Sequence, residues 1–141
     1  MEYRTLGKTG LKISRMGFGG IPIQKIDEEG TKKLLLQWQK KESTIFDSAR
    51  GYTVSETGIS VMGWRGISVI NLYIATKSMA RTKEAMAADI ETSLNNFRTD
   101  YIDLYQVHNP SMEQLDQVIG EGGALEALIE AKAAGKSDTL D

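Results

Sequence analysis

Short apolar runs alternate along the chain with longer stretches in which apolar residues recur every three or four positions. The short runs are rich in β-branched and aromatic residues, as strands usually are. They are RMGFGGIP (residues 15–22), STIFDSA (43–49), LYIATKS (72–78) and DYIDLYQVHN (100–109). This alternation predicts four strands that are separated by helices.

Two of the longer stretches have clear helix signals. Asp27 can cap a helix that runs to about Lys41. A second helix is expected to begin after Thr82. Its apolar stripe repeats in steps of four, four and three residues: Met86, Ile90, Leu94 and Phe97. A stripe of this kind packs against one neighbouring layer, so this helix is expected to cover a sheet.

The two ends of the chain carry weaker signals. Residues 2–6 and 11–15 are short strand-like runs around a glycine-containing turn, which predicts a hairpin that is an appendage to the main fold. Ser111 and Gln114 have the spacing of a capping box for a last helical region. Three glycines are expected to divide that region into two helices: Gly120, Gly122 and Gly123.

The predicted strand ends recur at a nearly constant interval. Gly20, Asp47, Lys77 and His108 are separated by 27, 30 and 31 residues, close to the roughly 30 residues of a βαβ unit. Strands that alternate with helices favour a parallel sheet with right-handed crossovers. These four residues are therefore expected to emerge together at the carboxyl edge of the sheet, where α/β folds place their ligands.

The expected fold class is therefore α/β, in one domain that spans residues 1–141. It divides into a hairpin (1–15), four βα units (16–136) and a tail (137–141). A hydrophobic content of 40% is sufficient for a single core at this length.

Composition and charge exclude several classes of function. The chain has no cysteine and one histidine, which argues against a zinc-thiolate or multi-histidine metal site. A net charge of −2 with both signs dispersed does not favour nucleic acid as a partner. Neither an apolar run of about 18 residues nor a signal-peptide core is present, so a cytoplasmic protein without membrane contact is expected.

The polar residues near the strand ends suit carbonyl reduction. Each has an ordinary structural explanation when taken alone, such as a turn cap for Asp47 or loop packing for Tyr52. Together they are more informative, because hydride transfer to a carbonyl builds negative charge on oxygen and requires a proton donor. A tyrosine becomes a better acid beside a lysine, and a carboxylate keeps that lysine charged. The predicted relay joins Asp47, Lys77 and Tyr52, with His108 orienting the substrate.

Four segments resemble the aldo-keto reductases, which are (β/α)8-barrel enzymes that reduce carbonyls with NADPH or NADH. The segments are YRTLGKTGLKISRMGFGG, FDSARGY, IATKS and YIDLYQVHNP. The sequences of these segments most resemble a branch of the family whose members often carry a C-terminal ferredoxin-like extension. The resemblance implies a small-molecule carbonyl substrate and a TIM-type barrel of which about four of eight units are present.

The resemblance also implies roles for individual residues. It places the catalytic tetrad on Asp47, Tyr52, Lys77 and His108, with Tyr52 as the proton donor. It implies that Gly19, Gly20 and Ile21 line the nicotinamide end of the cofactor cleft, beside Asp47. No metal site is expected, because the chain has no cysteine and one histidine.

Three features depart from the family pattern. Residues 53–72 are rich in glycine, serine and β-branched residues, so the second crossover helix is doubtful. The first helix lacks the glycine that usually closes it. The chain also ends where a fifth strand is expected to begin, whereas eight units take about 250 residues.

A half barrel has consequences for binding and assembly. It leaves out most of the family's cofactor contacts, so weak or absent NADPH or NADH binding is expected. It also leaves sheet edges unpaired, and an apolar lining around Phe46, Ile74 and Leu104 without an opposing half, so a homo-oligomer is possible. Two alternatives stay open. One is a non-catalytic half barrel that acts as a dimerising or interaction module, and the other is an open doubly wound sheet, which a reversed strand order would reveal.

Overall fold

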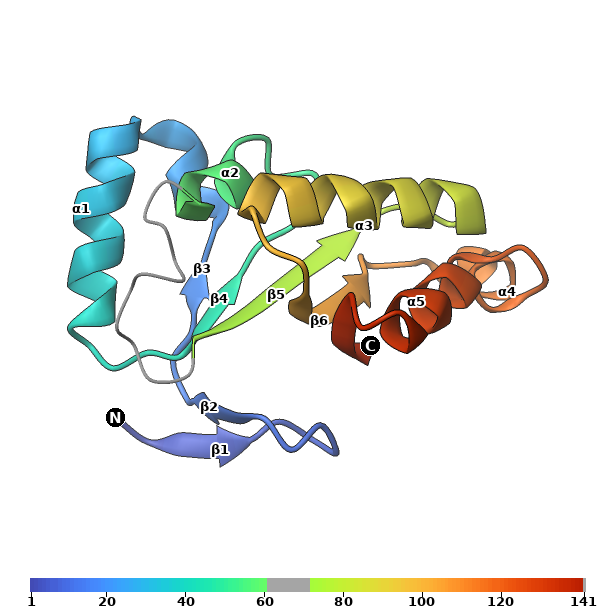
Figure 1. Ribbon diagram of the computed structural model, residues 1–141, viewed down its shortest axis with the longest axis horizontal. Coiled ribbons are helices and arrows are strands. Elements are labelled where there is room, and N and C mark those ends of the chain that lie inside the picture. Colours follow the sequence, from blue (N-terminus) through green and yellow to red (C-terminus); the bar gives the residue numbers. More distant parts are fainter. Residues whose placement is uncertain (61–71, 141) are drawn as a thin grey trace.

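The computed structural model describes residues 1–60 and 72–140. Its main elements, in chain order, are β1 (Tyr3–Thr5), β2 (Lys12–Ser14), β3 (Phe18–Gly19), a 3-10 turn η1 (Ile21–Lys25), α1 (Glu28–Gln39), β4 (Ile45–Asp47), α2 (Ser55–Ser60), β5 (Tyr73–Ser78), α3 (Lys83–Phe97), β6 (Ile102–Val107), α4 (Met112–Ile119), α5 (Ala124–Ala133) and β7 (Ser137–Leu140). Figure 1 shows α1, α2, α3 and α5 following one another around the strands.

One parallel sheet organises the chain. Its strands lie in the order β3-β4-β5-β6-β7, which is the order of the sequence, and each neighbouring pair is parallel. A sequential order without reversal is that of a (β/α) barrel and excludes the doubly wound alternative, which needs a switch point. The predicted fold class, about four units of a TIM-type barrel, is confirmed.

The last residues of the chain differ from the expected tail, because they form the strand β7. Residues 137–140 pair with β6 in parallel, and the Ile102 amide donates a hydrogen bond of 3.0 Å to the Lys136 carbonyl. The segment SDTL has no apolar run, so its sequence does not indicate a strand. The free edge of β6 supplies the partner groups that the local pattern lacks.

The helix α1 begins as predicted but ends earlier. The Asp27 carboxylate accepts a hydrogen bond of 2.8 Å from the Gly30 amide. The helix ends at Gln39, two residues before the predicted Lys41, and the chain then turns at Glu42, which has φ 58°. A glycine commonly occupies such a left-handed position after a helix, and here a glutamate adopts it.

The other helix signals are confirmed. Thr82 caps α3, and its side chain accepts a hydrogen bond from the Ala85 amide. The four residues of the predicted apolar stripe are buried: Met86, Ile90, Leu94 and Phe97. The last helical region is divided into α4 and α5, and between them Gly122 has φ 71°. The Gln114 side chain accepts a hydrogen bond of 3.1 Å from the Ser111 amide, which is one half of the expected capping box.

The N-terminal hairpin is also present and is attached to the start of the sheet. Strands β1 and β2 are antiparallel, as expected, and Figure 1 shows them beside the amino ends of the barrel strands. Ser14 and Thr44 exchange hydrogen bonds, because each backbone amide donates to the other residue's hydroxyl at 2.8 Å. The hairpin therefore lies at the edge opposite to the predicted site.

The core lies between the sheet and the helices. Phe18, Trp38 and Phe46 form an aromatic cluster with ring centroids 5.4–6.3 Å apart. Phe46 and Ile74 are fully buried in this core, so the expectation that they form an exposed barrel lining is wrong. Side chains alternate along a strand, and both residues face the helices. Leu104 is also buried, with 7% of its surface exposed.

Two further observations concern the crossover and the surface. In the doubtful second crossover the short helix α2 occupies residues 55–60, and residues 61–71 lie outside the described part of the chain.

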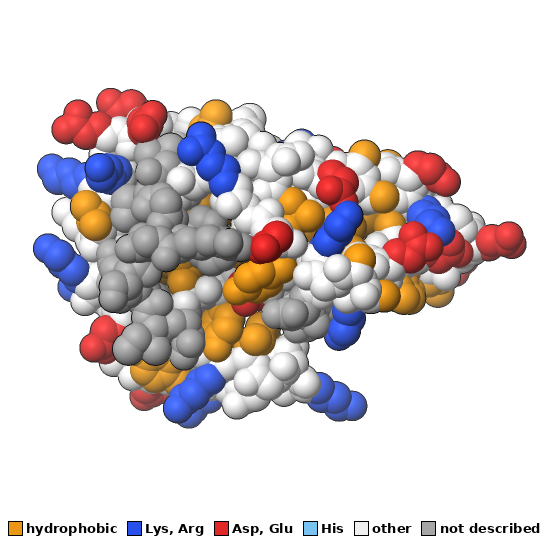
Figure 2. All heavy atoms as spheres, in the orientation of Figure 1, with side chains coloured by type: hydrophobic (Ala, Val, Ile, Leu, Met, Phe, Trp, Pro, Cys, Tyr) orange, Lys and Arg blue, Asp and Glu red, His pale blue; other side chains and the backbone are white. Residues whose placement is uncertain are grey.

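Acidic and basic side chains are interspersed over the described atoms in Figure 2. Within the residues that the structure describes, every helix is too short or too polar to cross a membrane.

The buried stripe of α3 gives a prediction about stability. Replacement Phe97→Ala should lower the free energy of unfolding by about 3–5 kcal/mol, because it removes a ring that has no solvent exposure. Chemical denaturation followed by circular dichroism measures the change. Leu36→Ala on α1, where 43% of the side chain is exposed, is the control and should change stability by less than about 1 kcal/mol. Equal midpoints for both variants would contradict the placement of Phe97 in the core.

Candidate active site

The parallel sheet brings the four candidate residues to one edge. Asp47 is the last residue of β4, Lys77 is the penultimate residue of β5, and His108 directly follows β6. Tyr52 lies in the loop after β4, where its amide donates a hydrogen bond of 3.0 Å to the Ala49 carbonyl. Since the strands are parallel, their carboxyl ends meet, as the regular sequence spacing predicted.

An ion pair forms the centre of this cluster. The Lys77 ammonium donates to both carboxylate oxygens of Asp47, at 2.9 and 2.8 Å, and to the Ser48 carbonyl at 2.7 Å. An ammonium has three N–H donors, so these oxygens account for all of them. The Lys77 side chain is 15% exposed and that of Asp47 is 46% exposed. The lysine is therefore largely buried, while the carboxylate is half exposed to solvent.

Tyr52 contacts this ion pair through its ring. The Lys77 ammonium lies 5.4 Å from the ring centroid, within the range of a cation–π contact. Lysine was expected within reach of both Asp47 and Tyr52. The structure shows hydrogen bonds to Asp47 and a ring contact to Tyr52, and within the described residues it shows no hydrogen bond to the tyrosine hydroxyl. The ring contact places the phenol beside the cation.

His108 completes the cluster. Its ring meets the Tyr52 ring edge-on, with centroids 5.9 Å apart and an interplanar angle of 85°. Its backbone amide donates a hydrogen bond of 2.7 Å to the Ser78 carbonyl, which fixes the residue to the end of β5. Burial and the cations Lys77 and Arg81 lower the pKa of His108, and Asp47 opposes them in part. The imidazole is therefore neutral at pH 7, when it has one N–H donor and one acceptor.

Gly19, the last residue of β3, and Gly20, which follows it, lie beside the end of β4. At Gly20, an added Cβ would lie 2.1 Å from the Ser55 hydroxyl, so only glycine allows this close packing. The Gly20 amide donates a hydrogen bond of 2.7 Å to the Asp47 carbonyl. At Gly19, no heavy atom lies within 4 Å of an added Cβ, and Ile21 is 53% exposed. Space is therefore open at Gly19, which pairs with Asp47 in the sheet, and apolar surface is exposed at Ile21.

The comparisons with known proteins identify the family of this chain. The model of the aldo/keto reductase family matches residues 15–138. The chain belongs to this family. This member is similar to L-galactose dehydrogenase of Arabidopsis thaliana, with 28% identity over 97% of this chain and 46% of the relative. It is also similar to the aldo-keto reductase YhdN of Bacillus subtilis, with 28% identity over 78% of this chain and 38% of the relative.

Solved structures show the same barrel fold. The aldo-keto reductase AKR11C1 from Bacillus halodurans, in its holo form, superposes with a TM-score of 0.84 and 24% identity. The match covers 99% of this chain and 49% of that structure. This aldo/keto reductase chain therefore spans about half the length of the relatives that it matches.

Several polar residues beside the site were not found from the sequence. The Arg50 guanidinium donates hydrogen bonds to Glu56 at 3.1 Å and to Asp89 at 3.3 Å. Arg50 lies within FDSARGY, but Glu56 lies in the segment whose structure was doubtful, and Asp89 is a polar residue on an amphipathic helix. The only sequence signal is an acid, Asp89, one position from the apolar stripe of α3. That signal is too weak to identify a partner.

The electrostatics of the cluster predict how His108 titrates. Lys77→Met should raise the pKa of His108, because it removes a nearby cation, and Asp47→Asn should lower it further. The chain has one histidine, so its imidazole proton resonances in an NMR titration are assigned without ambiguity. A pKa that is unchanged in both variants would show that the two charges lie too far from the ring.

The same shift has a consequence for stability. The pKa of His108 is lower in the folded chain than its ordinary value of 6.5. The unfolded chain therefore binds a proton first as the pH falls, so this residue reduces stability below about pH 6.5 and has no effect well above it. His108→Gln should remove this part of the acid destabilisation.

Proposed function

We propose that this chain contributes the proton-donating half of an NADPH- or NADH-dependent carbonyl reductase. The observation that supports this most is the cluster at the carboxyl edge of the sheet, where the Asp47–Lys77 ion pair lies against the Tyr52 ring and beside His108. The substrate is an aldehyde or ketone of a small molecule. When bound, the reduced nicotinamide supplies the hydride.

The residues of the chain then handle the proton. As hydride arrives at the carbonyl carbon, negative charge builds on the carbonyl oxygen, and the Tyr52 hydroxyl donates its proton to that oxygen. The Lys77 cation beside the ring stabilises the phenolate that remains, and Asp47 keeps the lysine charged and in place.

His108 holds the carbonyl oxygen in this mechanism. Its Nδ1 is buried and has no hydrogen-bond partner within the described residues. A buried N–H without an acceptor is less well tolerated than a bare acceptor, so we place the proton on Nε2. The Nε2–H then donates to the carbonyl oxygen next to the Tyr52 hydroxyl, which orients the substrate.

Gly19, Gly20, Ile21 and Asp47 would hold the nicotinamide end of the cofactor. The evidence is the exposed apolar surface at Ile21 and the empty space at Gly19, which pairs with Asp47 and its half-exposed carboxylate. In the family, the rest of the dinucleotide is bound mostly by barrel units that are not among those in this chain. We therefore expect weak cofactor binding by this chain alone.

A single hydroxyl tests the catalytic assignment. Tyr52→Phe keeps the ring and removes the proton donor, so it should lower kcat for a simple aldehyde by about 10²-fold or more. The assay follows NADPH oxidation by the 141-residue chain and by a chain extended to eight βα units. Tyr3→Phe, which removes a hydroxyl from the hairpin at the opposite edge, is the matched control. Equal activity with and without the Tyr52 hydroxyl in the extended chain would refute the assignment.

We also propose that the chain self-associates. β3 and β7 are the two edge strands of the sheet, and each has a partner on one side only within the described residues. Unpaired backbone groups on an edge strand can pair with a second copy. Light scattering over a hundredfold range of concentration should therefore show a mass above the 15.6 kDa of one chain. A constant monomer mass over that range would contradict this proposal.

A further inference from the structure

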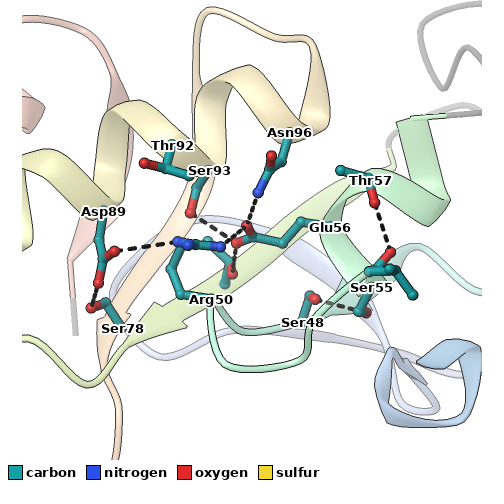
Figure 3. Close-up of polar contacts among 12 residues, drawn as sticks. Ser48, Arg50, Ser55, Glu56, Thr57, Ser78, Asp89, Thr92, Ser93 and Asn96 are labelled. Carbon is teal, nitrogen blue, oxygen red and sulfur yellow. Dashed lines mark hydrogen bonds and ion pairs between the residues drawn. The ribbon is translucent and has the colours of Figure 1, made fainter.

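A buried carboxylate lies directly behind the candidate site. Glu56, on α2, is 1% exposed, and its two oxygens accept four hydrogen bonds. The donors are Arg50 at 3.1 Å, Thr76 at 2.8 Å, Ser93 at 2.8 Å and Asn96 at 2.9 Å. Figure 3 shows Arg50, Ser93 and Asn96 converging on Glu56 from the loop after β4 and from α3. Every member of the proposed proton relay lies outside this network.

The network nevertheless holds the residues on either side of Lys77, and it also holds Arg50, which lies close to Tyr52 in the sequence. Thr76 and Ser78 flank Lys77 on β5, and since side chains alternate along a strand, both point away from the lysine. Thr76 bonds to Glu56 and Ser78 bonds to Asp89, so β5 is fixed on both sides of Lys77. The backbone amide of Arg50 donates a hydrogen bond of 2.9 Å to the Lys77 carbonyl.

Arg50 links these contacts to the tyrosine. It lies two residues before Tyr52, and its guanidinium bridges Glu56 on α2 and Asp89 on α3. The same residue is thus tied to β5 by its backbone and to two helices by its side chain. From this arrangement we infer that Arg50, held by Glu56 and Asp89, is a positioning residue that sets the placement of Tyr52 against Lys77. The inference deepens the proposed function and rests on it for its catalytic consequence.

Two variants separate positioning from stability. Arg50→Met should leave the Glu56 carboxylate buried without its cation, which destabilises the fold as well as releasing the loop. The double variant Arg50→Met with Glu56→Gln also neutralises the buried acid, so it should recover much of the thermal stability that Arg50→Met loses. It does not restore the guanidinium contacts that hold the loop before Tyr52 to α2 and α3. Lys83→Met with Glu130→Gln removes an exposed ion pair between α3 and α5 and is the matched control.

Two readouts are taken on the 141-residue chain and on the chain extended to eight units. The first is the NMR titration of His108, which reports on the position of Lys77 and needs no enzymatic activity. In the double variant the midpoint should rise by about 0.3 pH unit or more, as the cation loses its fixed place. The second is carbonyl reduction, for which kcat should fall about 10- to 100-fold while KM for the carbonyl changes less than about threefold.

The outcomes are distinguishable. If the unmodified chain extended to eight units reduces no carbonyl, the proposed function fails, and the His108 titration still tests the placement of Lys77. A double variant with the titration midpoint and kcat of the unmodified protein would overturn the inference, because the network would then serve stability alone. The control variant should match the unmodified protein in both readouts.

Discussion

Parallel pairing of consecutive strands is the constraint on which the rest of this structure depends. Because β3 to β7 pair in sequence order, every strand ends at the same edge, and residues about 30 positions apart become neighbours. The ion pair between Asp47 and Lys77 is a direct result, since it joins the ends of two adjacent strands. The same pairing directs the helices to the outside, where the apolar stripe of α3 is buried.

Two ionic groups with different surroundings lie on either side of β5. The Asp47–Lys77 pair is open to solvent at its carboxylate, so small molecules can reach it. Glu56 is enclosed, and four donors satisfy it. Burial of a carboxylate is costly unless it is paired and hydrogen-bonded, so such a group holds its partners in one arrangement. Lys77 lies between the two, since its side chain belongs to the open group and its strand neighbours Thr76 and Ser78 to the enclosed network.

The features that could be predicted are those with a local physical cause. Asp27 and Thr82 cap helices because a short polar side chain can bond the first free amides, and the signal lies within three residues. The end of α1 was predicted less well, since Glu42 adopts a left-handed conformation that a non-glycine residue seldom takes. The family pattern indicated that a fifth strand begins near the end of the chain, but the local sequence did not, because only pairing with β6 makes SDTL a strand. Phe46 and Ile74 were assigned to the wrong face, since a strand with apolar residues on both faces does not show which one meets the helices.

The sequence by itself determined the fold class and the four residues that gather at the sheet edge. The fold class follows from periodicity, and the placement of Asp47, Lys77 and His108 follows from the regular spacing of strand ends. Tyr52 was added because it lies just beyond Asp47 and because the family resemblance implies it. Only the tertiary structure revealed that Lys77 meets Tyr52 through the ring, and that Arg50, Glu56 and Asp89 form one network behind them. Those contacts join loop, strand and helix residues up to 39 positions apart. Their partners depend on how the layers pack, and no local pattern of residues encodes that packing.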